Sequence, residues 1–214
     1  WGLNNNMIKL TLFKALNHFD LDIKLHLESF SIAGVFGPSG SGKSTLLRCI
    51  SGLEGEQSVY INHQQVDHLP TEQRGVTLQV QSCPLFPHLD VAGNLAFTQT
   101  HCTNRQTDLT EQKVIEALEL QPLLKRDVHS LSGGERQRVV FARTLLAGKK
   151  FIILDEPFSA LDWPLRFKTL STISELAAEY NIKFMLVSHS LKELLFCCDT
   201  LVQLNNGKVI NHGP

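Results

Sequence analysis

The sequence predicts an α/β fold with a mainly parallel sheet, an N-terminal antiparallel β subdomain and an inserted α-helical subdomain. Short apolar runs alternate with helix-like patterns along most of the 214 residues, which is typical of α/β proteins. Residues 8–30 differ, because the segments 8–12 and 21–27 alternate apolar and polar side chains at period two, which favours antiparallel strands with one solvated face. A polar, irregular stretch at about 83–130 interrupts the α/β pattern and predicts the helical insertion.

The elements follow in order from these patterns. Residues 8–12 and 21–27 predict the two antiparallel strands, and residues 31–36 predict a buried strand that leads into a glycine-rich stretch. A helix is expected over 42–51, because Leu46, Leu47 and Ile50 share one helical face. Within the polar stretch, the clearest helix begins near Thr110.

The second half of the chain continues the alternation. The apolar runs 151–154 and 183–187 suit central parallel strands, and residues 165–180 between them fit a crossover helix. Near the end, two apolar runs flank Asn205-Asn206-Gly207, and an Asn-Gly pair is a strong hairpin signal. We therefore expect one domain over 1–214, with the helical subdomain inserted at about 83–130.

Composition limits the classes of partner. The chain carries 20 Lys and Arg against 21 Asp and Glu, a net charge of −1. This balance gives no basic surface for nucleic acid, so we expect no nucleic-acid partner. No apolar run approaches the roughly 18–20 residues that a membrane helix needs, so any link to a membrane is expected to go through another protein.

A phosphate-binding loop is the strongest motif. The pattern G-x-x-x-x-G-K-[ST] is matched by Gly37, Pro38, Ser39, Gly40, Ser41, Gly42, Lys43, Ser44 and Thr45. Glycines allow backbone N–H groups to surround phosphate, and the following helix directs its positive end at the same anion. Lys43 supplies charge to the β- and γ-phosphates, and Ser44 is placed to bind Mg²⁺. The motif lies between a predicted strand and a predicted helix, which predicts a P-loop NTPase core.

Two acids end the apolar run 151–154. Because adjacent side chains on a strand point to opposite sides, Asp155 and Glu156 are expected to do different work. Asp155 is the natural Mg²⁺ ligand, and Glu156 is then available as the general base that activates water. An acid pair that caps the next turn, before Pro157, is the alternative reading.

A second helix start has the features of an anion site. Ser132 is a good helix cap and Glu135 completes the capping-box pattern, but this role leaves Gly133 and Gly134 unexplained. Two glycines leave the helix end open to an anion. One ATP would use both this site and the phosphate loop if two copies of the chain packed head to tail.

The segment Leu131-Ser132-Gly133-Gly134-Glu135 resembles the signature of the ABC ATPase family, with Glu135 in place of the usual glutamine. The resemblance covers the whole chain in the family's order of motifs. It implies that Gln81 senses Mg²⁺ and the attacking water, that Asp162 lies in a loop crossing a dimer interface, and that His189 contacts the γ-phosphate. It also implies ATP and Mg²⁺ as cofactors and a second copy of the chain as a partner.

The adenine contact departs from the family pattern. The family stacks adenine on an aromatic residue near the first strand turn, where Phe13 or Phe19 is available here and Lys14 occupies the simple register. The turn before the phosphate-loop strand carries Phe30-Ser31 where the family has Gly-Glu. The sequence leaves the choice between Phe13 and Phe19 open.

Residues 81–89 resemble bacterial importer ATPases, in which this region receives a coupling helix from the permease. The resemblance implies permease subunits bound through residues 82–97, at the cytoplasmic face of the inner membrane. Short tracts around Gly93, Asp162 and Val187 are most similar to importers of the molybdate type. Thiamine- and ferric-iron-importer ATPases are the alternatives. Many such ATPases carry a further C-terminal β domain, and the sequence does not decide whether one belongs to this protein.

Non-transport ATPases of the same family fit less well. DNA-repair and chromosome-organising members need long coiled-coil arms between the phosphate loop and the signature, and no sustained heptads occur there. Translation factors of this family hold two cassettes on one chain, and this chain holds one. A non-catalytic cassette would lack Glu156 or His189.

Overall fold

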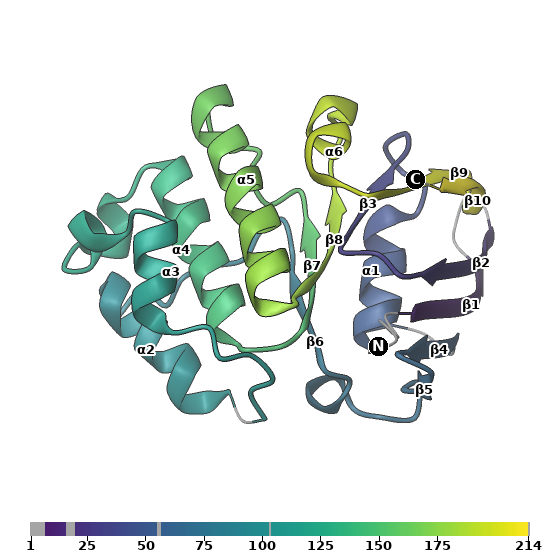
Figure 1. The fold of residues 1–214 in the computed structure, drawn as a ribbon, viewed down its shortest axis with the longest axis horizontal. Coiled ribbons are helices and arrows are strands. Elements are labelled where there is room, and N and C mark those ends of the chain that lie inside the picture. The colour runs from purple at the N-terminus through teal and green to yellow at the C-terminus, as the bar shows by residue number, and fades with distance from the viewer. Residues whose placement is uncertain (1–6, 16–19, 55–56, 103, 214) are drawn as a thin grey trace.

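The computed structural model describes residues 7–15, 20–54, 57–102 and 104–213, and it has the alternating α/β order that the sequence predicts (Figure 1). Its larger sheet has six strands in the order β10-β9-β3-β8-β7-β6. All neighbours in this sheet are parallel except β10, which returns antiparallel to β9. The bounds are β3 Ile32–Phe36, β6 Val76–Gln79, β7 Phe151–Asp155, β8 Lys183–Val187, β9 Thr200–Asn205 and β10 Lys208–Gly213.

The hairpin of β9 and β10 forms at the predicted place. Asn206 and Gly207 both have positive φ, 44° and 75°, as a tight turn between twisted strands requires. β7 is buried at every residue, which explains its continuous apolar run, because helices and the second sheet cover both faces.

The smaller sheet contains the antiparallel strands that the N-terminal pattern predicts. Its order is β2-β1-β4-β5, with bounds β1 Met7–Ala15, β2 Asp20–Glu28, β4 Gln57–Ile61 and β5 Gln64–Gln65. β2 alternates exposed and buried side chains at every step, which confirms one solvated face. β4 and β5 were not predicted from the sequence. Both residues of β5 are polar, so that strand gives no apolar signal.

Helices cover the larger sheet on both sides. In Figure 1, α1 lies between the two sheets, and α2 to α5 lie across the larger sheet from it. The bounds are α1 Lys43–Ser51, α2 Val91–His101, α3 Glu111–Ala117, α4 Gly133–Leu146, α5 Trp163–Tyr180 and α6 Leu191–Cys197, with 3₁₀ turns at Thr71–Gln73, Gln121–Leu123 and Val128–Ser130. The predicted helices 42–51 and 165–180 are α1 and α5. Thr110 caps α3 by accepting a hydrogen bond from the Lys113 N–H at 3.3 Å.

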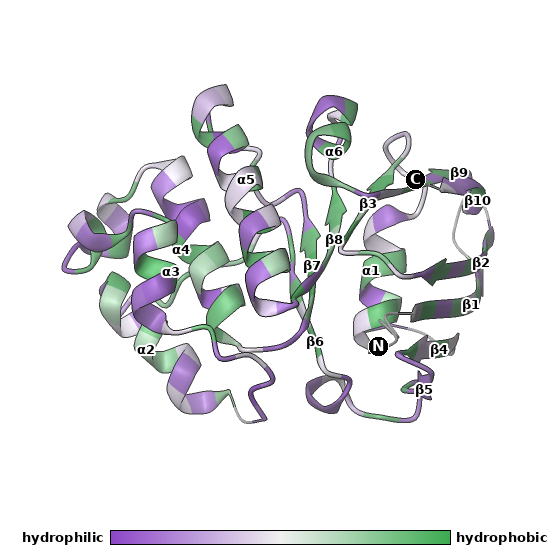
Figure 2. Ribbon diagram, viewed as in Figure 1, coloured by the Kyte–Doolittle hydropathy of each residue, from purple (hydrophilic) through white to green (hydrophobic). Residues whose placement is uncertain are grey.

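Two apolar clusters hold these layers together. One fills the space between the sheets around α1, and the other joins α2 to α6 to the far side of the larger sheet. Figure 2 shows the hydrophobic colour concentrated on strands such as β7 and β8 and mixed with polar residues on the helices. Side chains of the 83–130 segment belong to the same cluster as β7, so the limits of a helical subdomain stay a prediction.

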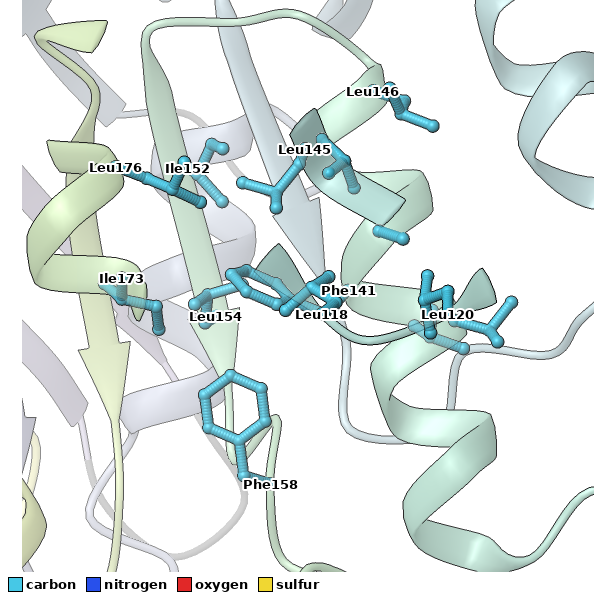
Figure 3. Close-up of a cluster of buried hydrophobic side chains, with 14 of the residues drawn as sticks. Leu118, Leu120, Phe141, Leu145, Leu146, Ile152, Leu154, Phe158, Ile173 and Leu176 are labelled. Carbon is cyan, nitrogen blue, oxygen red and sulfur yellow. The ribbon is translucent and has the colours of Figure 1, made fainter. Parts of the chain in front are cut away.

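The second cluster also positions the chain that follows β7. Phe141 of α4 points toward Leu154 of β7, and Phe158 approaches its ring edge-on at a centroid distance of 5.3 Å (Figure 3). A fully buried phenylalanine contributes about 1.5–3 kcal/mol, so this contact fixes α4 firmly beside the end of β7.

Candidate active site

The predicted phosphate loop runs from the end of β3 to the start of α1. A side chain at Gly37 would collide with the backbone carbonyl of Leu204 on β9, so this close approach requires glycine. Gly42 has φ 98° at the N-terminus of α1, a left-handed conformation that also favours glycine. The Gly207 N–H donates to the Ser41 carbonyl at 3.2 Å. The β9–β10 hairpin therefore supports the loop from behind.

The outer surface of the loop is open. Pro38, Ser39 and Gly40 are exposed, and a Cβ built on Gly40 meets nothing within 4 Å. Ser41 is buried, and its Oγ has no hydrogen-bond partner among the described residues. Ser44 is exposed and Thr45 half-buried in the first turn of α1. An open loop at a helix N-terminus is a fit for an anion.

Lys43 links this loop to the predicted acids. Its side chain is buried, and Nζ donates to the carbonyls of Gly37 and Pro38, each at 2.9 Å. Burial lowers the pKa of Lys43, and the negative charges of Glu156 and Asp155 oppose that shift. The lysine therefore lies within electrostatic reach of both acids.

The two acids differ in backbone conformation. Asp155 is the last residue of β7 and is buried. Glu156 has left the strand, because its φ of 47° is left-handed, and its N–H donates to the Val187 carbonyl at 3.1 Å. Strand alternation therefore does not extend to Glu156, which lies beyond the end of β7. A left-handed backbone at a residue with a side chain costs about 1–2 kcal/mol, which the surrounding contacts offset.

Three predicted side chains meet at the carboxylate of Glu156. His189 Nε2 lies 2.6 Å from Oε1, and Gln81 Nε2 donates to Oε2 at 3.1 Å. Gln81 follows β6, Glu156 follows β7 and His189 follows β8, which are adjacent parallel strands. Functional loops gather at the carboxyl ends of parallel strands, so the topology itself brings these residues together.

The start of α4 has the predicted capping box. Ser132 Oγ accepts from the Glu135 N–H at 3.3 Å, and the Ser132 N–H donates to the Glu135 carboxylate at 2.8 Å. That hydrogen bond and the guanidinium of Arg126 lower the pKa of Glu135. Glu135 therefore works as a cap in this chain.

Gly133 and Gly134 have a packing role besides the open helix end that the sequence suggests. A Cβ on Gly134 would lie 3.0 Å from Leu161 Cδ2, and one on Gly133 would lie 3.3 Å from Ala160 Cβ. The glycines let the 159–162 segment approach the helix closely. Gln137 of α4 fixes the same segment through Ser159 Oγ at 3.2 Å and the Ala160 N–H at 2.9 Å.

Some predicted site residues stay apart. Asp162 caps α5, accepting from the Leu165 N–H at 3.0 Å. In the described ranges, no hydrogen bond or ion pair joins the start of α4 or Asp162 to Lys43, Glu156 or His189. Strands of the larger sheet lie between α1 and α4 in Figure 1. Phe13 is 66% exposed on β1, and Phe19 lies outside the described residues.

The sequence analysis missed the residues behind His189. Ser188 Oγ donates to the Glu193 carboxylate at 2.6 Å, and Arg166 pairs with the same carboxylate at 2.8 Å. Both Ser188 and Glu193 are buried. The only sequence signal was the pattern Ser190-x-x-Glu193, which caps α6.

Comparisons with known proteins find similar sequences and structures. A sequence profile described as ABC transporter matches residues 21–159. The molybdenum import ATP-binding protein ModC of Aliivibrio fischeri is 37% identical over 95% of this chain, and that of Vibrio cholerae is 37% identical over 96%. This chain spans 57% of the length of each.

Solved structures give the same result. A nucleotide-free ATP-binding cassette from an ABC transporter superposes with a TM-score of 0.81 at 25% identity, covering 97% of this chain and 91% of that one. A dimeric bacterial ABC transporter cassette gives 0.80 at 25% identity, covering 96% and 97%. No helix of the described chain has the length and apolar character of a membrane span. The profile match, the relatives and the shared fold together show that the chain belongs to the ABC transporter family.

Proposed function

We propose that the chain binds and hydrolyses Mg-ATP as one half of a two-subunit unit, and that this energises the import of a molybdate-type oxyanion. The observation that carries the proposal is the Glu156 carboxylate, held between His189 at 2.6 Å and Gln81 at 3.1 Å close to the phosphate-loop lysine. A general base needs such a position beside the phosphate that reacts.

The phosphate loop is the proposed nucleotide site. The phosphates would be surrounded by Gly37, Pro38, Ser39, Gly40, Ser41, Gly42, Lys43, Ser44 and Thr45. The buried, unpaired Ser41 Oγ and the open surface at Gly40 fit this use. Phe13 and Phe19 remain the candidates for stacking on adenine.

The residues present also fit Mg²⁺. Ser44, Gln81 and Asp155 offer hydroxyl, amide and carboxylate oxygens, which are the ligands that this hard cation prefers. A bound Mg²⁺ would neutralise charge on the transferred phosphoryl group. Lys43 would contribute positive charge from the other side of the loop.

Glu156 is the proposed general base. Each oxygen of a carboxylate accepts more than one hydrogen bond, so Glu156 can take a proton from water while Gln81 and His189 hold it in place. The water oxygen forms the new bond to the γ-phosphorus, the bond to the β–γ bridging oxygen breaks, and ADP leaves with that oxygen. His189 and Gln81 orient the base and lie where they would contact the γ-phosphate and the water.

The second copy of the chain would complete the nucleotide site. Ser132, Gly133 and Gly134 at the start of α4 form a second helix N-terminus, and Asp162 follows the segment packed against it. Because contacts within one chain do not bring these residues to Lys43, we assign them to the ATP of the partner copy. A dimeric cassette is among the similar structures, which supports this arrangement.

The membrane partner would bind through residues 82–97. In this region, Phe97 is exposed and contacts Phe86 with its ring tilted by 55°, and the guanidinium of Arg143 lies over the Phe86 ring. We place the chain peripherally at the cytoplasmic face of the membrane, attached to permease subunits. The relatives compared are named for molybdenum import, which favours a molybdate-type substrate over thiamine or ferric iron.

Steady-state hydrolysis tests the proposal. Glu156→Gln should lower kcat by about a hundredfold or more, while binding of a fluorescent ATP analogue stays within about threefold. Lys43→Ala should lose most of that binding. Glu175→Gln, an exposed acid on α5, is the matched control and should behave like wild type. Full turnover by Glu156→Gln would overturn the assignment of the general base.

A further inference from the structure

Arg166 forms hydrogen bonds with two separate segments near the candidate active site. Its Nη2 donates to the carbonyls of Ser159 at 3.1 Å and Leu161 at 2.7 Å, which belong to the 159–162 segment. Its Nη1 donates to Glu193 Oε1 at 2.8 Å. The side chains of Arg166 and Glu193 are only 19% and 9% exposed. One guanidinium therefore spans from the 159–162 segment to α6.

Glu193 carries this connection to the chain around His189. Its second oxygen accepts from Ser188 Oγ at 2.6 Å, and that same hydroxyl accepts from the Ser190 N–H at 3.0 Å. The Ser190 Oγ in turn accepts from the Glu193 N–H at 3.4 Å. The Glu193 carboxylate thus holds Ser188 directly, and Ser190 is held through the Ser188 hydroxyl and the Glu193 N–H.

A small cavity lies against the same residues. It has a volume of about 160 Å³, and its lining includes Glu156, Ser159, Arg166, Ser188, His189 and Glu193. The Arg166–Glu193 pair therefore forms part of the wall directly behind the Glu156–His189 contact. A shift of either residue would change the space that His189 occupies.

Stability alone does not account for this pair. A buried ion pair contributes little net stability compared with apolar residues of the same volume, because both charges lose their hydration. Here the hydrogen bonds go to loop carbonyls and to a loop hydroxyl, and so fix the two loops relative to each other. That pattern favours a role in positioning.

We propose that Arg166 and Glu193, acting through Ser188, are positioning residues that couple the 159–162 segment to His189. The inference rests on the proposed function and deepens it. Because the 159–162 segment packs against the start of α4, its position would respond to the ATP held by the partner copy. The coupling then makes the placement of His189 against Glu156 depend on that segment.

The test separates turnover from binding in the complete chain. Arg166→Met, Glu193→Gln and Ser188→Ala should each lower kcat by about tenfold or more, with binding of a fluorescent ATP analogue changed by less than about threefold. Lys168→Met is the matched control on the same helix. Its Nζ pairs with Glu119 in an exposed position at 2.5 Å, so its kcat should equal that of wild type.

A double variant tests whether the pair acts as a unit. Arg166→Met with Glu193→Gln should be no slower than the slower single variant, whereas independent effects would multiply. Thermal melting checks that each variant is folded. Ser188→Ala keeps the Arg166–Glu193 ion pair intact, so it still tests the positioning role if a variant that breaks the pair fails to fold.

The outcomes separate this inference from the proposed function. A wild-type chain that binds but does not hydrolyse ATP contradicts both. Active wild type, with folded Ser188→Ala and Glu193→Gln turning over at the wild-type rate, contradicts the positioning role alone. Variants that lose binding but keep kcat also contradict it.

Discussion

At the scale of single residues, Glu156 is held by side chains from the loops on both sides of it. β7 lies between β6 and β8, so Gln81 and His189 reach the carboxylate from opposite neighbours. The left-handed backbone at Glu156 directs the side chain out of the strand line. The segments that follow β6, β7 and β8 thus together hold the Glu156 carboxylate in place.

Gly37 offers a sharp test of the phosphate loop. Gly37→Ala should lower the free energy of unfolding by about 3 kcal/mol or more, because the new methyl group collides with the Leu204 carbonyl. Urea unfolding measures this loss, and titration with a fluorescent ATP analogue should show weaker binding.

Gly40→Ala is the matched control. Its φ of 78° makes alanine unfavourable by about 1–2 kcal/mol, but no atom lies within 4 Å of the new methyl group. Equal losses for the two variants would show that backbone conformation, and not the contact with β9, requires the glycine at position 37.

At the scale of elements, Asn94 organises the segment that precedes α2. Its Oδ1 accepts from the Phe86 N–H at 2.8 Å, and its Nδ2 donates to the carbonyls of Phe86, Leu89 and Asp90. Asn94 is fully buried, so these bonds form away from water. One side chain thereby shapes the loop that is proposed to receive the permease.

Asn94→Ala should destabilise the chain by about 2–3 kcal/mol, since three carbonyls and one N–H of the loop each lose a hydrogen bond to the buried Asn94 side chain. Amide hydrogen exchange should rise in residues 86–90 more than elsewhere. Thr100→Ala is the control, because its exposed hydroxyl bonds only to the Ala96 carbonyl within α2. Unchanged exchange in 86–90 would contradict the role of Asn94.

The elements differ in how far the sequence predicts them. β2, β7, α1 and the β9–β10 hairpin follow from local periodicity and turn chemistry. The sequence gives no clear signal for α2. Its start depends on Asp90, which caps the helix by accepting a hydrogen bond from the Gly93 N–H, and on the contacts of the buried Asn94. β4 likewise forms by pairing with β1, which is distant along the chain, and β5 pairs in turn with β4.

At the scale of the whole molecule, Glu54 links the smaller sheet to α1. Its carboxylate pairs with Lys14 of β1 at 2.7 Å and with Arg48 of α1 at 2.5 Å. The hydrogen bond from Lys14 and these positive charges lower the pKa of Glu54 below its ordinary value of 4.5. The ionised form is therefore favoured by folding.

This shift predicts the direction of the acid response. A carboxylate with a lowered folded pKa adds stability that is complete above about pH 4.5 and is lost as pH falls through the folded value. Urea midpoints recorded from about pH 7 down to about pH 3 should fall less steeply for Glu54→Gln than for wild type. An acid slope in Glu54→Gln equal to that of wild type would contradict the prediction.

The candidate site shows the same division between local and distant information. Several site residues can be recognised in the sequence by their residue type and by their position after a predicted strand. They are Gly37–Thr45, Asp155, Glu156 and His189. The contacts of Arg166 with Glu193, and of Gln137 with Ser159, join segments more than 20 residues apart and depend on packing. Sequence patterns therefore predict candidates for the reacting residues, and the fold decides which side chains contact those candidates.

The central claim is that two copies share each ATP, and light scattering on Glu156→Gln after size exclusion tests it most directly. We expect a monomer without nucleotide and a dimer with Mg-ATP, because the variant binds ATP but does not hydrolyse it. Wild type should not accumulate the dimer, since hydrolysis reopens it. A variant that remains monomeric while saturated with ATP would contradict the shared site.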